Sequence, residues 1–526
     1  YAFEEADSKK RMLLGGKGAG LSEMTRLKLP VPPGFTITTE VCNKYYDNNK
    51  KLPKDVMPAV MKNIAKMEKK TGKKWNSIKN PLLVSVRSGA AVSMPGMMDT
   101  ILNLGLNEKT VEGFAEQTKN PRFSWDSYRR FIQLFGKVVF GVDDEKFNHV
   151  LNSAKKKQGV TDDSKLNVES LKKIVSKYKK ICEEHTKRKF PDTPDEQLVL
   201  SIEAVFKSWM GERAIVYREK NNITKDIANG TAVNIVTMVF GNMGDDSATG
   251  VVFTRNGSNG KKEIEGEYLI NAQGEDVVAG ARTGKSIELL KKDMPKSYKE
   301  LSNACAKLEK HFREPQDIEF TIEQGKFYLL QTRTAKMSAA ALVKTSVDMV
   351  KEKLIDKNRA LTRIPAQQLE ALLHRTMDES KIKDFKQLAK GIAASPGAAS
   401  GIVIFDVKKA IELGDAGKKV ILVRKETKPE DVPAFFSSEG ILTSLGGKSS
   451  HAAIVSRGMG KPCIVGCPEL EIDYDNNIGT ANGMTIKEGE TITIDGSAGT
   501  VFIGEIPTVE PKVTKDFEQI LQWAQK

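Results

Sequence analysis

One histidine of the chain stands in a setting suited to phosphoryl transfer. His451 follows a glycine turn and two serines, Gly446-Gly447-Lys448-Ser449-Ser450, and precedes the apolar run Ala-Ala-Ile-Val. Either serine is a natural N-cap, so we expect His451 in the first turn of a helix. The helix dipole there disfavours an imidazolium and stabilises an added phosphate, and a neutral imidazole is a nucleophile. The segment predicts a phosphohistidine; the alternative is a histidine with a purely structural role.

A second set of polar residues lies in a predicted hairpin centred on Gly325. Polar and apolar residues alternate before it, which places Asp317 and Glu319 on one face of a half-buried strand. With a three-residue loop, the returning strand sets Gln331 opposite Glu319. It also sets Arg333 opposite Asp317. Carboxylate and amide oxygens suit Mg²⁺, and an arginine offers a bidentate fork to a phosphate. The alternative is a surface hairpin with an Asp–Arg salt bridge.

Two basic residues could contact the same phosphates. Lys17 lies in the glycine-rich segment Gly15–Gly20, which we expect to form a loop before an apolar helix. Glycines allow backbone N–H groups to approach phosphate oxygens, and a helix start is electropositive. Arg87 follows a predicted buried strand at 82–86, and ligands of α/β sheets bind at strand ends. A structural glycine turn is the alternative for the first segment.

Two further segments are candidates for nucleotide contact. The methionine-rich run around Gly96 and Met98 could pack against a purine ring, or it could fill a corner of the core. A glycine- and threonine-rich loop at 241–250 lies between two predicted strands and could cover phosphates.

The elements that position these residues change along the chain. Residues 108–220 and 336–387 carry helical patterns that are rich in charge, whereas the flanking segments carry short strand patterns. From about residue 391 to 505 the chain is rich in Gly, Ile and Val. We therefore place a domain boundary near residue 388.

The composition excludes several classes of protein. Hydrophobic residues make up 39% of the 526 residues, which argues against global disorder. The sequence contains no apolar run of about 20 residues, so no membrane span is expected. Five cysteines cannot form a disulfide framework, and reduced thiols in the cytoplasm are expected. The net charge of +14 is spread along the chain, which favours a solvated surface over nucleic-acid binding.

Three long motifs of the chain resemble the pyruvate, phosphate dikinase family. They are Ser85-Val-Arg-Ser-Gly-Ala90, the run from Ser93 to Gly105 beginning Ser-Met-Pro-Gly-Met-Met-Asp-Thr, and the run from Gly446 to Lys461 around His451. The likeness extends from Gly15 to about Ala524. The phosphoenolpyruvate synthases share the histidine motif more loosely.

The resemblance implies an α/β (α+β) architecture with two functional domains. An ATP-grasp nucleotide-binding domain would occupy residues 1–335 with a helical insert at 108–220. A helical linker at 336–387 would lead to a swivelling β/β/α phosphohistidine domain at 388–505. Residues 506–526 would form a linker towards a barrel for pyruvate or phosphoenolpyruvate, which we expect this chain to lack.

The resemblance also implies roles for residues already singled out. His451 would be the phosphocarrier. Lys17, Arg87 and Arg333 would hold phosphates. Glu319 and Gln331 would hold Mg²⁺, and Asp317 would orient the cation or the ribose end. The further nucleotide contacts would be Gly96, Met98, Thr249 and Gly250.

The implied activity is a phosphotransfer in which ATP and inorganic phosphate phosphorylate His451, releasing AMP and pyrophosphate. In the full-length enzyme the phosphohistidine then converts pyruvate to phosphoenolpyruvate. We expect this chain to perform only the nucleotide half as a monomer, although full-length family members are expected to be homodimers. Neither nucleic acid nor a membrane is an expected partner.

Two residues beside the histidine depart from the family pattern. Ser449 stands where the family usually has Thr, and Lys448 stands where it usually has Met. Lysine at this position is closer to the synthase pattern, so a phosphoenolpyruvate synthase-like enzyme is one alternative. A phosphocarrier or regulatory module phosphorylated by a partner is another.

Overall fold

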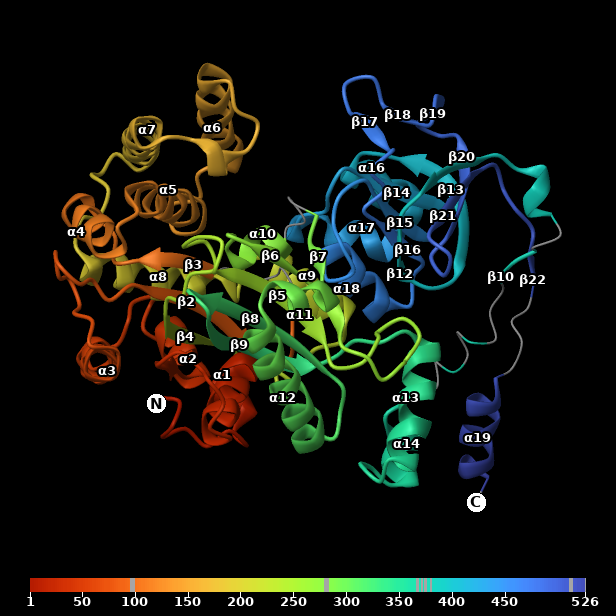
Figure 1. Cartoon of the computed structure of the whole chain (residues 1–526), viewed down its shortest axis with the longest axis horizontal. Coiled ribbons are helices and arrows are strands. Elements are labelled where there is room, and N and C mark those ends of the chain that lie inside the picture. Colours follow the sequence, from red (N-terminus) through yellow and green to blue (C-terminus); the bar gives the residue numbers. More distant parts are fainter. Residues whose placement is uncertain are drawn as a thin grey trace. The chain divides into compact units, whose positions relative to one another are not determined.

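Figure 1 shows the helices and strands of the chain in a computed structural model. The chain divides into two units. The first unit comprises residues 1–243 with 328–331, and the second comprises 244–327 with 332–526. The residues that the structure describes are 1–94, 100–278, 283–365, 369, 372, 376–378, 381–509 and 514–525.

Among the described residues, the first unit contains an antiparallel sheet of four strands. In spatial order these are β1 (Gly34–Ile37), β4 (Thr231–Thr237), β2 (Val84–Ala90) and β3 (Thr100–Leu104). We expect a strand at 82–86, but β2 continues beyond residue 86 because residues 88–90 pair with residues 231–233 of β4. Arg87 therefore lies within a central strand instead of after its end.

The glycine-rich segment of the first unit lies inside helix α1 (Arg11–Arg26), so the expected loop is wrong. The helix is kinked at Gly15, whose φ of 69° lies in the left-handed region that favours glycine. Helices α2 (Thr39–Asp47) and α3 (Val56–Thr71) follow along the chain.

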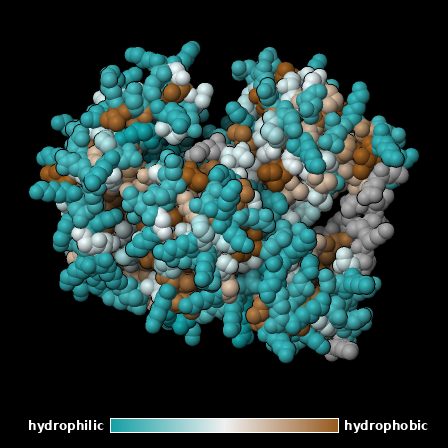
Figure 2. Space-filling view, viewed as in Figure 1, coloured by the Kyte–Doolittle hydropathy of each residue, from teal (hydrophilic) through white to brown (hydrophobic). Residues whose placement is uncertain are grey.

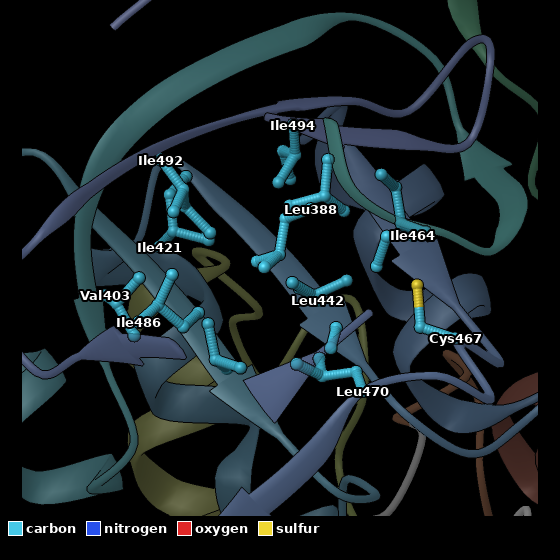
Figure 3. Packing of buried hydrophobic residues seen from close by; sticks show 14 of the residues in the cluster. Leu388, Val403, Ile421, Leu442, Ile464, Cys467, Leu470, Ile486, Ile492 and Ile494 are labelled. Carbon is cyan, nitrogen blue, oxygen red and sulfur yellow. The ribbon is translucent and has the colours of Figure 1, made fainter. Parts of the chain in front are cut away.

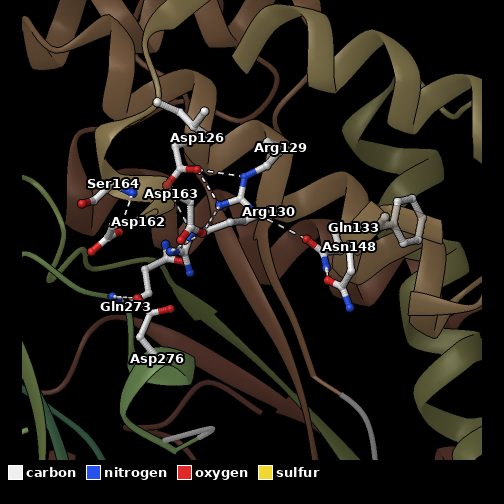
Figure 4. A network of polar contacts seen from close by, with 12 residues as sticks. Asp126, Arg129, Arg130, Gln133, Asn148, Asp162, Asp163, Ser164, Gln273 and Asp276 are labelled. Atoms are coloured by element: carbon white, nitrogen blue, oxygen red, sulfur yellow. Dashed lines mark hydrogen bonds and ion pairs between the residues drawn. The ribbon is translucent and has the colours of Figure 1, made fainter. Parts of the chain in front are cut away.

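Residues 108–220 form helices joined by short connections. They are α4 (Glu108–Thr118), α5 (Pro121–Val138), α6 (Asp144–Gln158), α7 (Val168–Thr186), α8 (Pro194–Ser208) and α9 (Glu212–Lys220). In Figure 4, buried Arg129 of α5 donates to Asp126 at 2.6 Å and to Asp163 at 3.2 Å. Burial would raise the pKa of Asp126, but Arg129 and Arg130 outweigh it and lower this pKa to about 2. The ion pairs fix α5 to the segment that precedes α7.

In the described part of the second unit, a sheet of five strands carries the predicted hairpin. In spatial order the strands are β7 (Lys285–Ser286), β6 (Glu265–Ile270), β5 (Ala248–Phe253), β8 (Gln316–Glu323) and β9 (Lys326–Thr334). The turn between β8 and β9 has two residues instead of the expected three. Gln324 and Gly325 both have positive φ, 48° and 74°, as in the tight turns that match the strand twist. Helices α10 (Gly274–Val278), α11 (Leu290–Asp293) and α12 (Pro295–Phe312) belong to the same unit.

Residues 387–503 form a mixed sheet of eight strands within the described chain. In spatial order these are β11 (Gln387–Lys390), β21 (Thr500–Ile503), β20 (Thr491–Asp495), β13 (Ala398–Ile404), β14 (Val420–Arg424), β15 (Gly440–Thr443), β16 (Cys463–Val465) and β12 (Ile392–Ser395). Strands β13 to β16 are parallel to one another. Their inward side chains, such as Val403, Ile421, Leu442 and Ile464, form one buried apolar core (Figure 3).

Three helices and a small sheet complete this region. They are α16 (Val407–Asp415), α17 (Val432–Ser437), α18 (His451–Met459), and the strands β17 (Glu471–Asp473), β18 (Ile478–Ala481) and β19 (Met484–Lys487).

The two segments expected to be linkers pack against each other. Helix α13 (Ala339–Lys351) is followed by α14 (Lys357–Thr362), and buried Val343 and Val347 of α13 contact Phe517 and Ile520 of α19 (Lys515–Ala524). The expectation of helix throughout 336–387 is wrong in part, because β10 (Thr376–Met377) pairs as a strand with β22 (Thr508–Val509).

The surface is mostly hydrophilic, as expected from the charged residues spread along the sequence. Hydrophilic residues cover most of the face in Figure 2. Large exposed hydrophobic side chains such as Ile78, Met210 and Tyr474 are far apart in sequence, and single exposures of this kind are normal. Within the described ranges, none of the helices combines the length and apolar character needed to cross a bilayer.

Candidate functional site

The first unit brings two predicted site residues together across 244 positions of sequence. One guanidinium nitrogen of Arg87 donates to the backbone oxygen of Leu330 at 3.2 Å. The other donates to the side-chain oxygen of Gln331 at 3.4 Å. Gln331 is buried and Arg87 is partly exposed. This arrangement places the Arg87 guanidinium beside the Gln331 amide oxygen, and the roles of the two residues towards phosphate and Mg²⁺ stay predictions.

Lys17 lies beside the same strand as Arg87. A Cβ at Gly89 would lie 3.3 Å from the Cβ of Lys17, and one at Gly15 would lie 2.0 Å from the backbone oxygen of Gly89. These glycines therefore allow α1 to pack closely on β2. Close packing explains the glycines without a ligand, and the phosphate-binding role of Lys17 stays a prediction.

Asp317 and Arg333 form an ion pair in the second unit, but the two-residue turn does not keep the register from which we expected them to pair. Nε of Arg333 donates to Oδ2 of Asp317 at 2.6 Å, and Asp317 is only 2% exposed. In the described part of the chain, the other oxygen of this carboxylate has no hydrogen-bond partner. Burial raises the pKa of Asp317 and neighbouring Glu319 adds to the shift, whereas Arg333 opposes it.

The oxygen donors fit the magnesium chemistry expected from the sequence. Glu319 is partly exposed on β8, and buried Asp317 offers an oxygen without a partner in the described chain. The described residues contain no group of three or more His, Cys, Asp and Glu side chains arranged for a metal. Mg²⁺ in proteins keeps water and substrate phosphate ligands, so these carboxylates would supply only part of its coordination. Gln331 belongs to the first unit and Glu319 to the second, so their joint role stays a prediction.

Thr249 and Gly250 have structural roles at the centre of the second sheet. The Thr249 hydroxyl is buried and lies 3.2 Å from the backbone oxygen of Phe320 and 3.3 Å from the hydroxyl of Thr321. A Cβ at Gly250 would lie 2.6 Å from a ring atom of Phe320. Their nucleotide contacts stay predictions, and Gly96 and Met98 lie outside the described residues.

His451 occupies the helix position expected from its sequence. It is the first residue of α18, and the hydroxyl of Ser450 caps this helix by accepting from the backbone N–H of Ala453 at 3.5 Å. The imidazole is buried, and its centre lies 6.4 Å from that of Phe435. The hydroxyl of neighbouring Ser449 is also buried and has no hydrogen-bond partner in the described chain.

Two acidic residues next to the histidine loop escaped the sequence analysis. Oε1 of Glu267 accepts from the backbone N–H of Lys448 at 2.9 Å, and the ammonium group of Lys448 forms an ion pair with Glu265. Both carboxylates come from β6. The only signal in the sequence is the spacing Glu-Gly-Glu, which places two acids on one face of a strand.

Family comparisons agree with this arrangement. The family model described as pyruvate phosphate dikinase, AMP/ATP-binding domain, matches three segments of the chain, residues 11–51, 48–299 and 289–354. Residues 416–499 match the model described as PEP-utilising enzyme, mobile domain. The fold and these matches define a mixed α/β chain with an ATP-grasp-type nucleotide-binding region followed by a mobile domain that contains His451.

Full-chain comparisons narrow this class to one family. The pyruvate, phosphate dikinase of Entamoeba histolytica is 52% identical over 527 residues, which cover 100% of this chain and 59% of that protein. The protein of the same name from Clostridium symbiosum is 49% identical, with 100% and 60% coverage. The one from Rhizobium meliloti is 48% identical, with 99% and 59% coverage. The chain belongs to the pyruvate, phosphate dikinase family and spans about three fifths of the length of these curated relatives.

Proposed function

We propose that this chain transfers a phosphoryl group from ATP to His451 in the manner of a pyruvate, phosphate dikinase. The observation that carries the proposal is the position of His451 at the capped N-terminus of α18. Backbone N–H groups at a helix start stabilise the negative charge of an added phosphate. The basic residues Lys17, Arg87 and Arg333 supply the complementary sites for the polyphosphate.

The proposed chemistry has two steps. A ring nitrogen of His451 forms a bond to the β-phosphorus of ATP, and the bond from that phosphorus to the bridging oxygen of the α-phosphate breaks, so AMP leaves. Inorganic phosphate then attacks the outer phosphorus of the pyrophosphorylated histidine. The bond between the two phosphoryl groups breaks, pyrophosphate leaves, and phosphohistidine remains.

Positioning and charge neutralisation are the main tasks of the other residues. Phosphoryl transfer asks little covalent chemistry of a protein beyond the nucleophile. Arg87 and Arg333 would hold phosphate oxygens with their planar forks, and Lys17 would add a point charge. Glu319 and Gln331 would hold Mg²⁺, which supplies further neutralisation of the phosphates.

The proposed acceptor of the phosphohistidine is pyruvate, because the relatives are named for it. We expected the chain to stop at the nucleotide half. The match of residues 416–499 to a domain of PEP-utilising enzymes does not support that restriction. Incubation of the chain with ATP, phosphate and pyruvate, followed by an assay for phosphoenolpyruvate, decides between the half-reaction and the whole one.

Product analysis without any partner protein tests the proposal against a passive phosphocarrier. The account predicts AMP release when the chain is mixed with ATP and Mg²⁺, and pyrophosphate release only when inorganic phosphate is added. An absence of AMP under these conditions would mean that the histidine receives its phosphate from another protein.

A further inference from the structure

The loop that precedes His451 is held by an oriented carboxylate on β6. Oε2 of Glu265 accepts from the backbone N–H of Gly257 at 2.9 Å, and Oε1 receives the ammonium group of Lys448. Glu265 is 8% exposed and Lys448 is 33% exposed, so the ion pair is partly shielded from water. A shielded, charge-assisted hydrogen bond with a fixed acceptor is stronger than an exposed ion pair.

The second carboxylate of β6 lies directly against the backbone of the same loop at Gly447. A Cβ at Gly447 would lie 1.9 Å from both carboxylate oxygens of Glu267. Burial raises the pKa of Glu267, and Glu265 adds to the shift, while Lys448 opposes it. The contact therefore brings two acidic residues and one lysine together at the edge of the histidine loop.

A buried arginine of α18, the helix that carries His451, contacts the neighbouring strand β5. Arg457 is 1% exposed, and its guanidinium carbon lies 4.7 Å from the ring centre of Phe253, the last residue of β5. Its nitrogens donate to the backbone oxygens of Lys448 and Ala453, the latter at 3.3 Å. Arg457 thus connects the loop, the helix and the nucleotide-binding sheet.

An apolar contact supports the polar ones. Ile454 of α18 packs in one buried cluster with Phe253 of β5 and with Met337 and Ala341 at the start of α13. His451 is therefore flanked on both sides in sequence by residues that contact β5 or β6.

We propose that Lys448 and Arg457 are positioning residues that dock His451 on the nucleotide-binding sheet, through a docking cluster of Lys448, Glu265, Arg457 and Phe253. The inference rests on the proposed function of His451 as phosphocarrier. An uncharged side chain at position 448 cannot form the ion pair with Glu265. Docking in this chain therefore has an electrostatic component that depends on this lysine.

The docking cluster makes a specific prediction about salt. An ion pair with partial exposure weakens as ionic strength rises, because mobile ions screen the charges. Docking of His451 should therefore become weaker between low and high salt in the parent chain. Lys448→Met should weaken docking at low salt by about tenfold, or about 1.4 kcal/mol, and should remove most of the salt dependence.

Variants that remove or swap the charges of Lys448 and Glu265 in the full 526-residue chain distinguish a loss of docking from a general loss of structure. The variants are Lys448→Met, Glu265→Gln and the double exchange Lys448→Glu with Glu265→Lys. Lys408→Met is the matched control, because Lys408 is an exposed lysine on α16 of the same domain. Two readouts are taken on each protein: the rate at which [β-³²P]ATP labels the chain, and amide hydrogen exchange of residues 446–459.

Both single variants should be labelled more slowly and should show about tenfold faster hydrogen exchange, and the control should not change. The charge-swapped double variant should recover in part, because it restores the ion pair but loses the acceptor for the backbone N–H of Gly257. Unchanged exchange at residues 446–459 in Lys448→Met and Glu265→Gln would overturn the docking cluster, whatever the labelling. An absence of labelling in the parent chain would instead contradict the proposed function. The hydrogen-exchange data would still show in that case whether the docking cluster holds residues 446–459.

Discussion

Asp317 of β8 and Arg333 of β9 form an ion pair, with Nε of Arg333 2.6 Å from Oδ2 of the carboxylate. The aspartate is almost fully buried, while the arginine retains an exposed fraction of 23%. The pair therefore fixes a guanidinium group that keeps part of its surface exposed to solvent. A fixed arginine loses little conformational entropy when it receives a phosphate.

Asp317→Asn should destabilise the second unit by about 1–3 kcal/mol, because it leaves a largely shielded arginine without its counter-charge. Urea unfolding measures the change. The comparison variant is Asp348→Asn, which breaks the more exposed pair with Lys344 and should cost about 0–1 kcal/mol. Equal costs for the two variants would contradict the burial argument.

Stability of the helical insert should depend on pH through Asp126. The lowered pKa of about 2, against an ordinary value of 3.8, means that this carboxylate stabilises the folded state by about 2 kcal/mol above pH 4. The contribution is lost as the pH falls from about 4 towards 2. Asp126→Asn should remove this contribution at pH 7, and the free energy of unfolding of the variant should fall less between pH 4 and pH 2.

Urea titrations at several pH values, followed by circular dichroism, check this pH dependence. Asp226→Asn is the matched control, since Asp226 is exposed to solvent. An Asp126→Asn variant that keeps the acid-induced loss of the parent chain would rule out Asp126 as its source.

Gly447→Ala should slow phosphorylation of His451 by about tenfold, since its Cβ would overlap the Glu267 carboxylate at 1.9 Å and force that side chain away from the backbone N–H of Lys448. The domain should still fold, because the apolar core lies elsewhere. Gly479→Ala, where the nearest atom to a Cβ would be a flexible Ile486 carbon at 3.2 Å, is the control. Parent-like labelling of Gly447→Ala would show that the close approach to Glu267 is not required.

Arg87→Met should weaken ATP binding by about tenfold to a hundredfold, because a phosphate contact and the hydrogen bond to Gln331 are lost together. Isothermal titration calorimetry with ATP and Mg²⁺ measures the affinity. Arg188→Met, which removes an exposed arginine after α7, should leave it unchanged. Equal affinities of Arg87→Met and the parent chain would exclude Arg87 from the nucleotide site.

The features predicted correctly from sequence are those set by neighbouring residues. Alternation of polar and apolar side chains predicts the strand that carries Asp317, and the cap of α18 follows from Ser450. The length of the turn was wrong by one residue, because Lys326 pairs in β9 and does not extend the loop.

The features that the sequence analysis did not predict depend on contacts between residues far apart in the chain. Arg87 lies within β2 because residues 88–90 pair with β4, more than 140 positions away. The glycines after residue 15 form helix because α1 packs on that strand. Glu265 and Glu267 acquire their role only through Lys448, about 180 positions later. Local sequence patterns do not predict contacts between residues so far apart in the chain.

Labelling with [β-³²P]ATP tests the central claim most directly. The account predicts an acid-labile label on the parent chain, mapped to residue 451, and an equal label on His149→Ala, which removes an exposed histidine of α6. It predicts no label on His451→Ala. A label that persists in His451→Ala, or that maps to another residue, would contradict the assignment of His451 as the phosphocarrier.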